Sequence, residues 1–196
     1  MEIVKEPRPF EERELTVIMI GRFSDVKRYH WVVREVMPRL MREIPSVKLI
    51  IIGGVGTIFS NKYYRQTLEL ARRYGITMET YKSAPGKLKI ELMDRARAFL
   101  HAAINEQWGI AIAEAMARGL PVVVHKSGGA WSDLAMNGEY GIGFDTSDDA
   151  VEALARLLTD SKIWGYYSHK SQERVSDLSF NNFIVKLRSE LSLVGL

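Results

Sequence analysis

The stretch Asn105–Gly129 constrains the fold more than any other part of this sequence. It begins with a loop and continues as a helix from about Trp108 to Arg118, where Gly119 ends it. A buried strand over Pro121–Val124 and a glycine-rich turn follow. The helix is apolar on nearly every side, which favours burial between two layers of structure. A buried helix that leads into a buried strand is typical of a sheet covered by helices.

Apolar strands alternate with helices along the rest of the chain. The further strands expected are Leu15–Ile20, Val47–Ile52, Ile76–Tyr81, Ala98–Ala103 and Gly141–Phe144. The further helices expected are Tyr29–Ile44, Lys62–Tyr74, Lys87–Ala96, Trp131–Met136 and Asp148–Leu158, with two more between Ser161 and Leu196. Pro38 should kink or split the first of these helices. The predicted fold class is α/β, with a doubly wound, mostly parallel, Rossmann-like sheet covered on both faces and followed by C-terminal helices.

The charge balance and the missing cysteines exclude several function classes. Among 196 residues, 27 Lys and Arg stand against 24 Asp and Glu, a mixed surface that argues against nucleic-acid binding. Without cysteine the chain forms neither disulfides nor thiolate metal sites. No apolar run reaches the ~18 residues of a membrane span, and the acidic N-terminus has no signal-peptide pattern. We therefore expect a cytoplasmic location, with peripheral contact at the cytoplasmic face of a membrane as a further option.

The hydrophobic content of 46% is enough for one good core, so a single domain is expected. Residues 1–14 are charged and contain two prolines, which indicates a linker or an entering arm. Residues 15–196 then form the domain. Basic residues on the helix predicted over Lys62–Tyr74 favour a solvated face over a patch for an anionic partner.

Polar or glycine-rich loops follow most of the predicted strands. Because the carboxyl ends of parallel strands share one edge of the sheet, these loops should converge, and ligands bind at that edge in folds of this class. The converging loops are Gly21-Arg22, Gly53-Gly54, Lys82–Ala84, Asn105-Glu106 and Ser127–Gly129. The convergence is the strongest indication of a site that the residues alone give.

Two carboxylates frame the central helix. Glu106 precedes the free N–H groups near Trp108, Gly109 and Ile110, and such a helix start attracts phosphate. Glu114 lies on the flank of the helix, roughly 9 Å from its start near Trp108 at about 1.5 Å per residue. A nucleotide-sugar offers hydroxyls, a diphosphate and a ribose in the matching order. Each glutamate alone also fits an ordinary helix residue, but a carboxylate on so apolar a helix should have a partner or a ligand.

Arg22 and Lys27 lie on the same edge and could neutralise a diphosphate opposite the helix start. Taken singly, both also fit surface cations of a polar loop. His101 and His125 end strands and have no obvious acid partner in the sequence, so packing is the expected role of each, although His101 could face a sugar.

These motifs resemble the C-terminal, donor-binding domain of retaining GT-B glycosyltransferases of family 4, the glycosyl transferases group 1. Gly21-Arg22 with Lys27 resembles the diphosphate site of that family, and Ile51–Gly54 resembles its strand-glycine element. The spacing of Glu106 and Glu114, followed by Gly119 and Pro121, resembles its paired-glutamate signature, and Ser127–Gly129 matches the next turn. The likeness covers roughly residues 15–160.

The resemblance implies a role for each motif. Glu106 would hold hydroxyls of the donor sugar, Glu114 the ribose hydroxyls, and the two cations the diphosphate. The implied catalytic residues are Glu106, Arg22 and Lys27, and the implied donor-binding residues are Gly21, Gly53, Gly54, Ser83, Ala84, Trp108, Gly109, Ile110, Glu114, Gly128 and Gly129. The base would lie against Lys82–Ala84. Such enzymes usually need no metal and no cofactor beyond the donor, GDP-mannose or another nucleotide-sugar.

One departure bears on the donor. The family often has a glutamate three residues after the second glycine, where this chain has Ser132 with Asp133 next. That spacing is similar to eukaryotic mannosyltransferases that extend lipid-linked oligosaccharide, which favours GDP-mannose as donor and a glycan or lipid-linked acceptor. The resemblance also implies that an N-terminal, acceptor-binding domain is missing, that the chain is an excised or separately encoded half, and that it has little transfer activity alone.

Two other interpretations stay open at this point. One is a fragment of a sugar epimerase built on the GT-B plan, which should have catalytic carboxylates and histidines from two domains. The other is a non-catalytic Rossmann-like binding or scaffold module, in which the two glutamates have no shared role.

Overall fold

The structure, a computed structural model, describes residues 3–193 and contains a six-stranded sheet in the order β3-β2-β1-β4-β5-β6. Every pair of neighbouring strands is parallel. The strands are β1 Glu14–Ile20, β2 Lys48–Gly53, β3 Met78–Lys82, β4 Ala96–His101, β5 Val122–His125 and β6 Ile142–Phe144. The predicted doubly wound parallel sheet is confirmed. The strand order reverses between β1 and β4, and the loops that leave these two strands diverge there to form a crevice.

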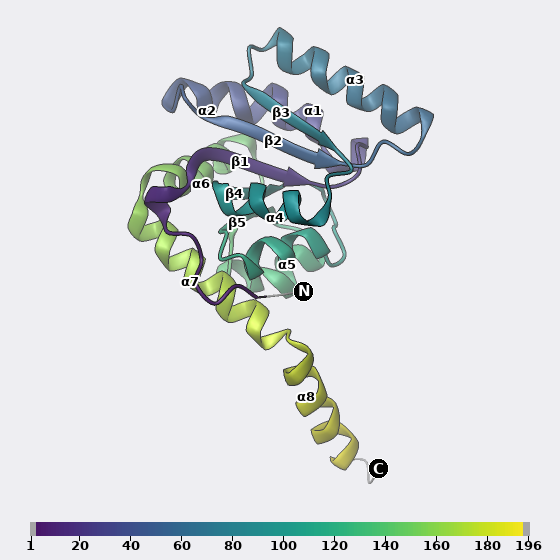
Figure 1. The fold of residues 1–196 in the computed structure, drawn as a ribbon, viewed down its shortest axis with the longest axis vertical. Helices are drawn as coiled ribbons and strands as arrows, with labels where there is room; N and C mark the ends of the chain where they lie inside the picture. Colours follow the sequence, from purple (N-terminus) through teal and green to yellow (C-terminus); the bar gives the residue numbers. More distant parts are fainter. Residues whose placement is uncertain (1–2, 194–196) are drawn as a thin grey trace.

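Helices cover both faces of this sheet (Figure 1). The α-helices of the described residues are α1 Tyr29–Trp31, α2 Met37–Glu43, α3 Ile58–Arg73, α4 Gly86–Arg95, α5 Ile110–Ala117, α6 Ser147–Thr159, α7 Ser161–Asp177 and α8 Phe180–Leu193, of which α8 does not cover the sheet. Alternate residues of each strand point to opposite faces. Val17 of β1 thus joins the apolar layer under α2 and α6, whereas Ile18 joins the layer under α4 and α5.

The helical segment from Tyr29 to Glu43 is divided, as Pro38 predicts. A π-helical turn over Val32–Val36 connects α1 with α2, and Pro38 lies in the first turn of α2. Proline has no N–H to donate and its ring clashes with the carbonyl four residues earlier, so a regular α-helix does not pass through it. The wider π turn accommodates the ring while the apolar side chains still face the sheet.

Several element boundaries differ from the sequence-based prediction, and two of them bear on the loops at the edge of the sheet. The third helix begins at Ile58 instead of Lys62, because Thr57 and Ser60 form a reciprocal capping box across its first turn. Ile58 and Phe59 are apolar but exposed, so the first turn of this helix does not show the amphipathic pattern that would mark its start. The fourth strand ends at His101 instead of Ala103, so the loop towards Glu106 is longer than expected.

The segment before β1 packs against the body of the domain. Arg13 is buried and donates hydrogen bonds to the carbonyl oxygens of Met93 (3.0 Å) and Ala96 (2.9 Å). Phe10 lies against the ring of Trp164 on α7. A linker or an entering arm was predicted for residues 1–14. Arg13, near the end of this segment, is buried because its guanidinium satisfies carbonyl groups at the junction of α4 and β4.

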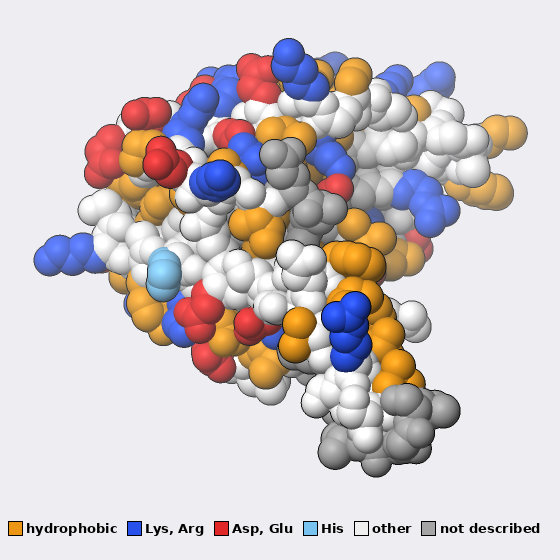
Figure 2. Space-filling model, turned by 60° about the horizontal axis from the view of Figure 1, so that its bottom comes forward, with side chains coloured by type: hydrophobic (Ala, Val, Ile, Leu, Met, Phe, Trp, Pro, Cys, Tyr) orange, Lys and Arg blue, Asp and Glu red, His pale blue; other side chains and the backbone are white. Residues whose placement is uncertain are grey.

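The chain ends with the two predicted helices. The first of them, α7, packs against α5, and α8 extends away from the body. Apolar side chains run along α8 towards the end of the chain (Figure 2), among them Phe180 and Phe183. Acidic and basic side chains are interspersed on the same face of the molecule. None of the described helices is both long and apolar enough to cross a membrane.

Gly53 is required where the ends of β1 and β2 approach each other. The N–H of Gly21 donates to the carbonyl oxygen of Ile52 at 2.9 Å. A methyl group on Gly53 would come within 2.1 Å of the carbonyl oxygen of Gly21, whereas one on Gly54 would meet nothing within 4 Å. The first glycine therefore has a steric reason, and the second one leaves room on the edge of the sheet.

Gly53→Ala should lower the free energy of unfolding by about 2 kcal/mol or more, because backbone atoms have to move to admit the methyl group. Gly54→Ala is the matched control and should leave it unchanged or raise it by up to ~1 kcal/mol, since alanine reduces the entropy of the unfolded chain. Urea unfolding of the two variants measures the difference. Equal effects of both substitutions would contradict the steric explanation.

Candidate functional site

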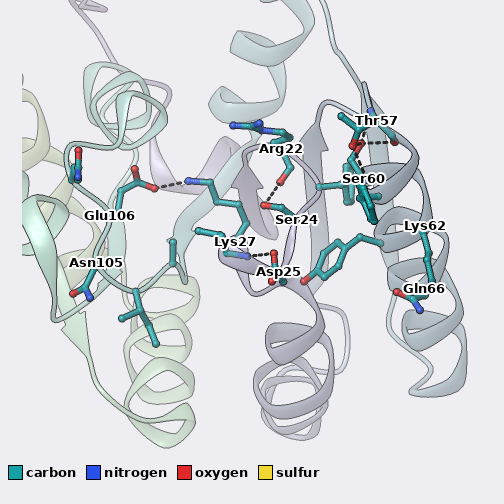
Figure 3. A pocket seen from close by; sticks show the side chains of 17 residues that line it. Arg22, Ser24, Asp25, Lys27, Thr57, Ser60, Lys62, Gln66, Asn105 and Glu106 are labelled. Atoms are coloured by element: carbon teal, nitrogen blue, oxygen red, sulfur yellow. Dashed lines mark hydrogen bonds and ion pairs between the residues drawn. The ribbon is translucent and has the colours of Figure 1, made fainter.

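An open groove of about 1040 Å³ lies at the carboxyl edge of the sheet. The loop after β1, the first half of α3 and the loop after β4 form its walls (Figure 3). Its lining residues are Arg22, Phe23, Ser24, Asp25, Val26, Lys27, Thr57, Phe59, Ser60, Lys62, Tyr63, Gln66, Ala103, Ile104, Asn105, Glu106 and Gln107. The three residues predicted to be catalytic, Arg22, Lys27 and Glu106, thus share one groove.

Glu106 is the centre of a hydrogen-bonded cluster. Lys27 Nζ lies 2.5 Å from Glu106 Oε2, and the two side chains point towards each other from separate loops (Figure 3). His101 Nε2 lies 2.9 Å from the same oxygen. The cluster joins the loop after β1 to the end of β4 and to the loop that follows it.

Charge and burial shift the protonation equilibria of this cluster. Burial lowers the pKa of His101 from its ordinary 6.5 to about 4, the charge of Lys27 adds to the decrease, and Glu106 opposes it. For Glu106, burial acts to raise the pKa, but the hydrogen bond and charge of Lys27, followed by His101, bring the pKa below its ordinary 4.5. At neutral pH the cluster therefore holds an ionised carboxylate next to a neutral imidazole, which donates through Nε2–H.

Arg22 approaches the cluster from the loop after β1. Its side chain is exposed, it lines the groove, and within residues 3–193 no hydrogen bond or ion pair of its guanidinium is found. Lys27 differs, because a carboxylate already neutralises its charge. Arg22 is thus a cation that is available for an anionic ligand, as is the exposed Lys62 on the opposite wall, whereas Lys27 would be shared between such a ligand and Glu106.

The start of α5 lies directly after this cluster in the chain. Gly109 is the residue before the first turn, in a left-handed conformation with φ of 81°, and no side chain caps the turn. Trp108 and Ile110 are exposed on either side of it. The uncapped N–H groups fit the predicted anion contact. Neither flanking residue lines the groove, so the helix start lies next to it and not within it.

The structure places Glu114 outside the groove lining. Its Oε1 lies 2.6 Å from Lys89 Nζ on α4, and its side chain is 28% exposed. The prediction that a carboxylate on this apolar helix has a partner or a ligand is therefore met by a lysine. The predicted ribose contact needs a ligand that reaches from the groove past the start of α5 to its flank.

Gly128 and Gly129 support the loop that carries Glu106. An added methyl group would lie 2.4 Å from the carbonyl oxygen of Glu106 at Gly128, and 1.8 Å from that of Gln107 at Gly129. The N–H of Ala130 donates to the carbonyl oxygen of Glu106 at 3.2 Å. These contacts give both glycines a packing reason, while the role in donor binding that the resemblance implies stays a prediction.

The other predicted contacts lie at different places along the edge of the sheet. Ser83 is exposed with φ of 54°, and Ala84 packs against the apolar layer under α4. Ser132 Oγ donates to Asp133 Oδ1 at 2.6 Å, and the carboxylate of Asp133 faces Gly129. None of these residues lines the groove.

Sequence reasoning missed the hydrogen bond between His101 and Glu106. No acid partner was expected for this histidine, yet Glu106 binds its ring. A polar residue that closes an apolar strand five positions before a glutamate was the available signal. His125 differs, because its Nδ1 lies 2.8 Å from Ser127 Oγ and its ring packs edge-on against Phe144. Across the described part of the chain, no group of three or more His, Cys, Asp or Glu could hold a metal ion, and the expected independence of metal stays a prediction.

Comparison with known proteins shows what this chain is similar to. The protein-family model described as "Glycosyl transferases group 1" matches residues 1–175 of this chain. The human "GDP-Man:Man(3)GlcNAc(2)-PP-Dol alpha-1,2-mannosyltransferase" is 27% identical over 166 residues, which are 78% of this chain and 34% of that protein. A trehalose synthase of Pyrococcus horikoshii is 25% identical over 181 residues, which are 89% of this chain and 41% of that protein. The chain thus spans only about a third of the length of its curated relatives.

Solved structures have the same fold at lower identity. A sucrose-phosphate synthase from Thermosynechococcus elongatus superposes with a TM-score of 0.77 at 20% identity, over 95% of this chain and 46% of that one. HepE from Anabaena, solved in complex with UDP and glucose, gives 0.74 at 19% identity, over 95% of this chain and 50% of that one. The C-terminal domain of a "Glycosyl Transferase Group 1 Family Protein" from Francisella tularensis gives 0.72 at 18% identity, and the match covers 89% of this chain and 93% of that domain.

The buried imidazole predicts a pH dependence of stability. As the pH falls below 6.5, the unfolded chain protonates this histidine, while folded His101 stays neutral down to about pH 4. The unfolded state then binds more protons than the folded state. The stability that depends on a neutral His101 is therefore fully present above pH 6.5 and is lost as the pH falls towards 4. When the pH is lowered from about 7 to about 5, the free energy of unfolding of His101→Gln should therefore fall by about 2 kcal/mol less than that of the wild type.

Urea unfolding at each pH measures this difference. His125→Gln is the control and should change the slope less, because the ring of His125 is only half-buried and burial lowers its pKa to a smaller degree. Parallel curves for His101→Gln and the wild type would show that the folded protein does not hold this imidazole neutral.

Proposed function

The chain belongs to the glycosyl transferases group 1 family, and from this premise we propose that it is the donor-binding domain of a retaining glycosyltransferase. The domain binds a nucleotide-sugar, and the whole protein transfers a hexose to a glycan or lipid-linked acceptor. The observation that supports this most directly is the groove shared by Arg22, Lys27 and Glu106. Two cations next to a carboxylate match a ligand with a diphosphate joined to a hydroxyl-bearing sugar.

Each groove residue has a defined task in this proposal. Arg22 and Lys27 bind the diphosphate and stabilise the negative charge that develops on it as the bond from sugar carbon to phosphate oxygen breaks. Glu106 accepts hydrogen bonds from sugar hydroxyls. The uncapped start of α5 adds backbone N–H groups for a phosphate oxygen. No metal is required, because the side chains and the helix end supply the positive charge.

GDP-mannose is the proposed donor, and mannose is the sugar that is transferred. The proposal draws support from relatives whose names begin with GDP-Man and from the Ser132-Asp133 spacing after the glycine turn. HepE, a structural neighbour, was solved with UDP-glucose, so UDP-sugars are the first competitors to test. Because the chain covers about a third of its relatives, we propose that a second domain binds the acceptor and completes the enzyme. A cytoplasmic location, at a membrane surface if the acceptor is a lipid, belongs to the same proposal.

A non-catalytic binding or scaffold module is the second candidate. The ion pair between Glu114 and Lys89 favours it, because the pair satisfies the glutamate without any ligand. A sugar epimerase fragment has less support. His101 has an acid partner after all, but its ring is only 3% exposed and does not line the groove, so it does not reach a substrate.

The two cations give the first test. Arg22→Met combined with Lys27→Met should weaken binding of GDP and GDP-mannose at least about tenfold, because two charge-assisted contacts to the diphosphate are lost. Arg42→Met on α2, an exposed arginine outside this groove, is the matched control and should bind like the wild type. Isothermal titration with GDP, UDP and ADP also ranks the bases. If the wild type binds no nucleotide at millimolar concentration, the proposed function is wrong.

Glu114 separates the two candidates. Glu114→Gln should reduce nucleotide affinity about tenfold, since ribose hydroxyls lose a charged acceptor, and stability should change by no more than ~1 kcal/mol because the ion pair is partly exposed. Lys89→Met breaks the same pair from the other side and should retain nucleotide affinity. Titration together with thermal unfolding checks both variants. Lowered stability in both, with affinity unchanged in both, would favour the scaffold module.

A further inference from the structure

His101 is a buried polar residue at the end of an apolar strand. It closes β4 after Ala98, Phe99 and Leu100, all fully buried, and its own side chain is nearly inaccessible. An apolar residue would fill this position without the cost of burying a ring that binds protons. Within residues 3–193, the one hydrogen bond found for its side chain goes to Glu106. The contact with Glu106 thus accounts for a polar ring at a position where packing alone would need only an apolar side chain.

Both donors of the cluster meet the same carboxylate oxygen. Lys27 Nζ lies 2.5 Å from Glu106 Oε2, and His101 Nε2 lies 2.9 Å from it. No donor to Glu106 Oε1 is found among the described residues, although an ionised carboxylate accepts hydrogen bonds on both oxygens. With Oε2 held by the protein, Oε1 is the oxygen left for a hydroxyl group of a ligand in the groove.

The two donors differ in how firmly they hold the carboxylate. Lys27 lines the groove on a flexible stem, and its ammonium is also the proposed partner of a diphosphate. His101 lies outside the groove lining, and burial fixes its ring. When an anionic ligand draws Lys27 away from Glu106, the hydrogen bond from His101 still sets the orientation of the carboxylate.

We propose that His101 is a positioning residue for sugar recognition: its Nε2–H fixes Glu106 Oε2 so that Oε1 faces a hydroxyl of the donor sugar. The inference rests on the proposed function and deepens it, because it separates recognition of the sugar from recognition of the nucleotide. His101 contacts the protein only. The sugar hydroxyl donates to Glu106, and the imidazole stays neutral throughout.

The test compares binding of a nucleotide with binding of its sugar conjugate. His101→Leu should weaken GDP-mannose binding about tenfold, the factor expected when a ligand loses a well-placed charged acceptor, and should change GDP binding less than about twofold. If titration of the wild type selects another base, the same comparison uses that nucleotide and its sugar conjugate. His101→Gln is the matched rescue variant, because its amide nitrogen lies near the position of Nε2 and donates a hydrogen bond. It should restore most of the affinity for the sugar conjugate.

A double substitution checks that His101 acts through Glu106. Glu106→Gln should cause the same selective loss of affinity for the sugar conjugate, and adding His101→Leu to it should weaken binding no further, since coupled residues are not additive. Additive losses in the double variant would overturn the inference.

Other outcomes separate this inference from the proposed function. An unchanged ratio of the two affinities in His101→Leu overturns the inference alone. Equal losses for both ligands with a lowered melting temperature, or a failure of His101→Gln to rescue, assign a purely structural role to the histidine and also overturn it. If the wild type binds neither ligand, the proposed function fails and the inference fails with it.

Discussion

The parallel pairing of β1 with β4 is the constraint on which the rest of this structure depends. These strands are adjacent at the point where the strand order reverses, so the loops that leave their carboxyl ends open a groove between them. One loop carries Lys27 and the other carries Glu106, and the 2.5 Å contact between them spans that groove. Without this adjacency, two residues 79 positions apart in the sequence would not come into contact.

Close backbone approaches hold the edge of the sheet in place around this pair. Gly53 admits the backbone at Gly21, and the turn at Gly128 and Gly129 lies against the carbonyl groups of the Glu106 loop. In these positions the lack of a side chain matters more than any contact that a side chain could make. The same glycines are part of the motif that resembles a donor site, so these members of the motif have a packing reason of their own.

Much of the fold could be predicted because its signals are local. Apolar runs, glycine turns and Pro38 mark the strands and the divided first helix within a few residues of their observed bounds. The predictions for the start of α3 and the end of β4 were wrong. Neither the capping box at Thr57 nor the end of the strand at His101 is marked by a change in the pattern of apolar and polar residues around it. Glu114 was expected to have a partner, but no local pattern indicates that Lys89 fills this role.

The sequence by itself determined an α/β domain and the residues on its carboxyl edge, because hydrophobic period and turn chemistry act over short distances. It also placed Arg22, Lys27 and Glu106 on that edge together. Only the tertiary structure decided that Glu106 is held by His101 and Lys27 on one oxygen, and that Glu114 faces α4 outside the groove. Such pairings depend on how separate loops and helices pack in three dimensions, and side-chain geometry at that scale is not encoded in any local stretch of the chain.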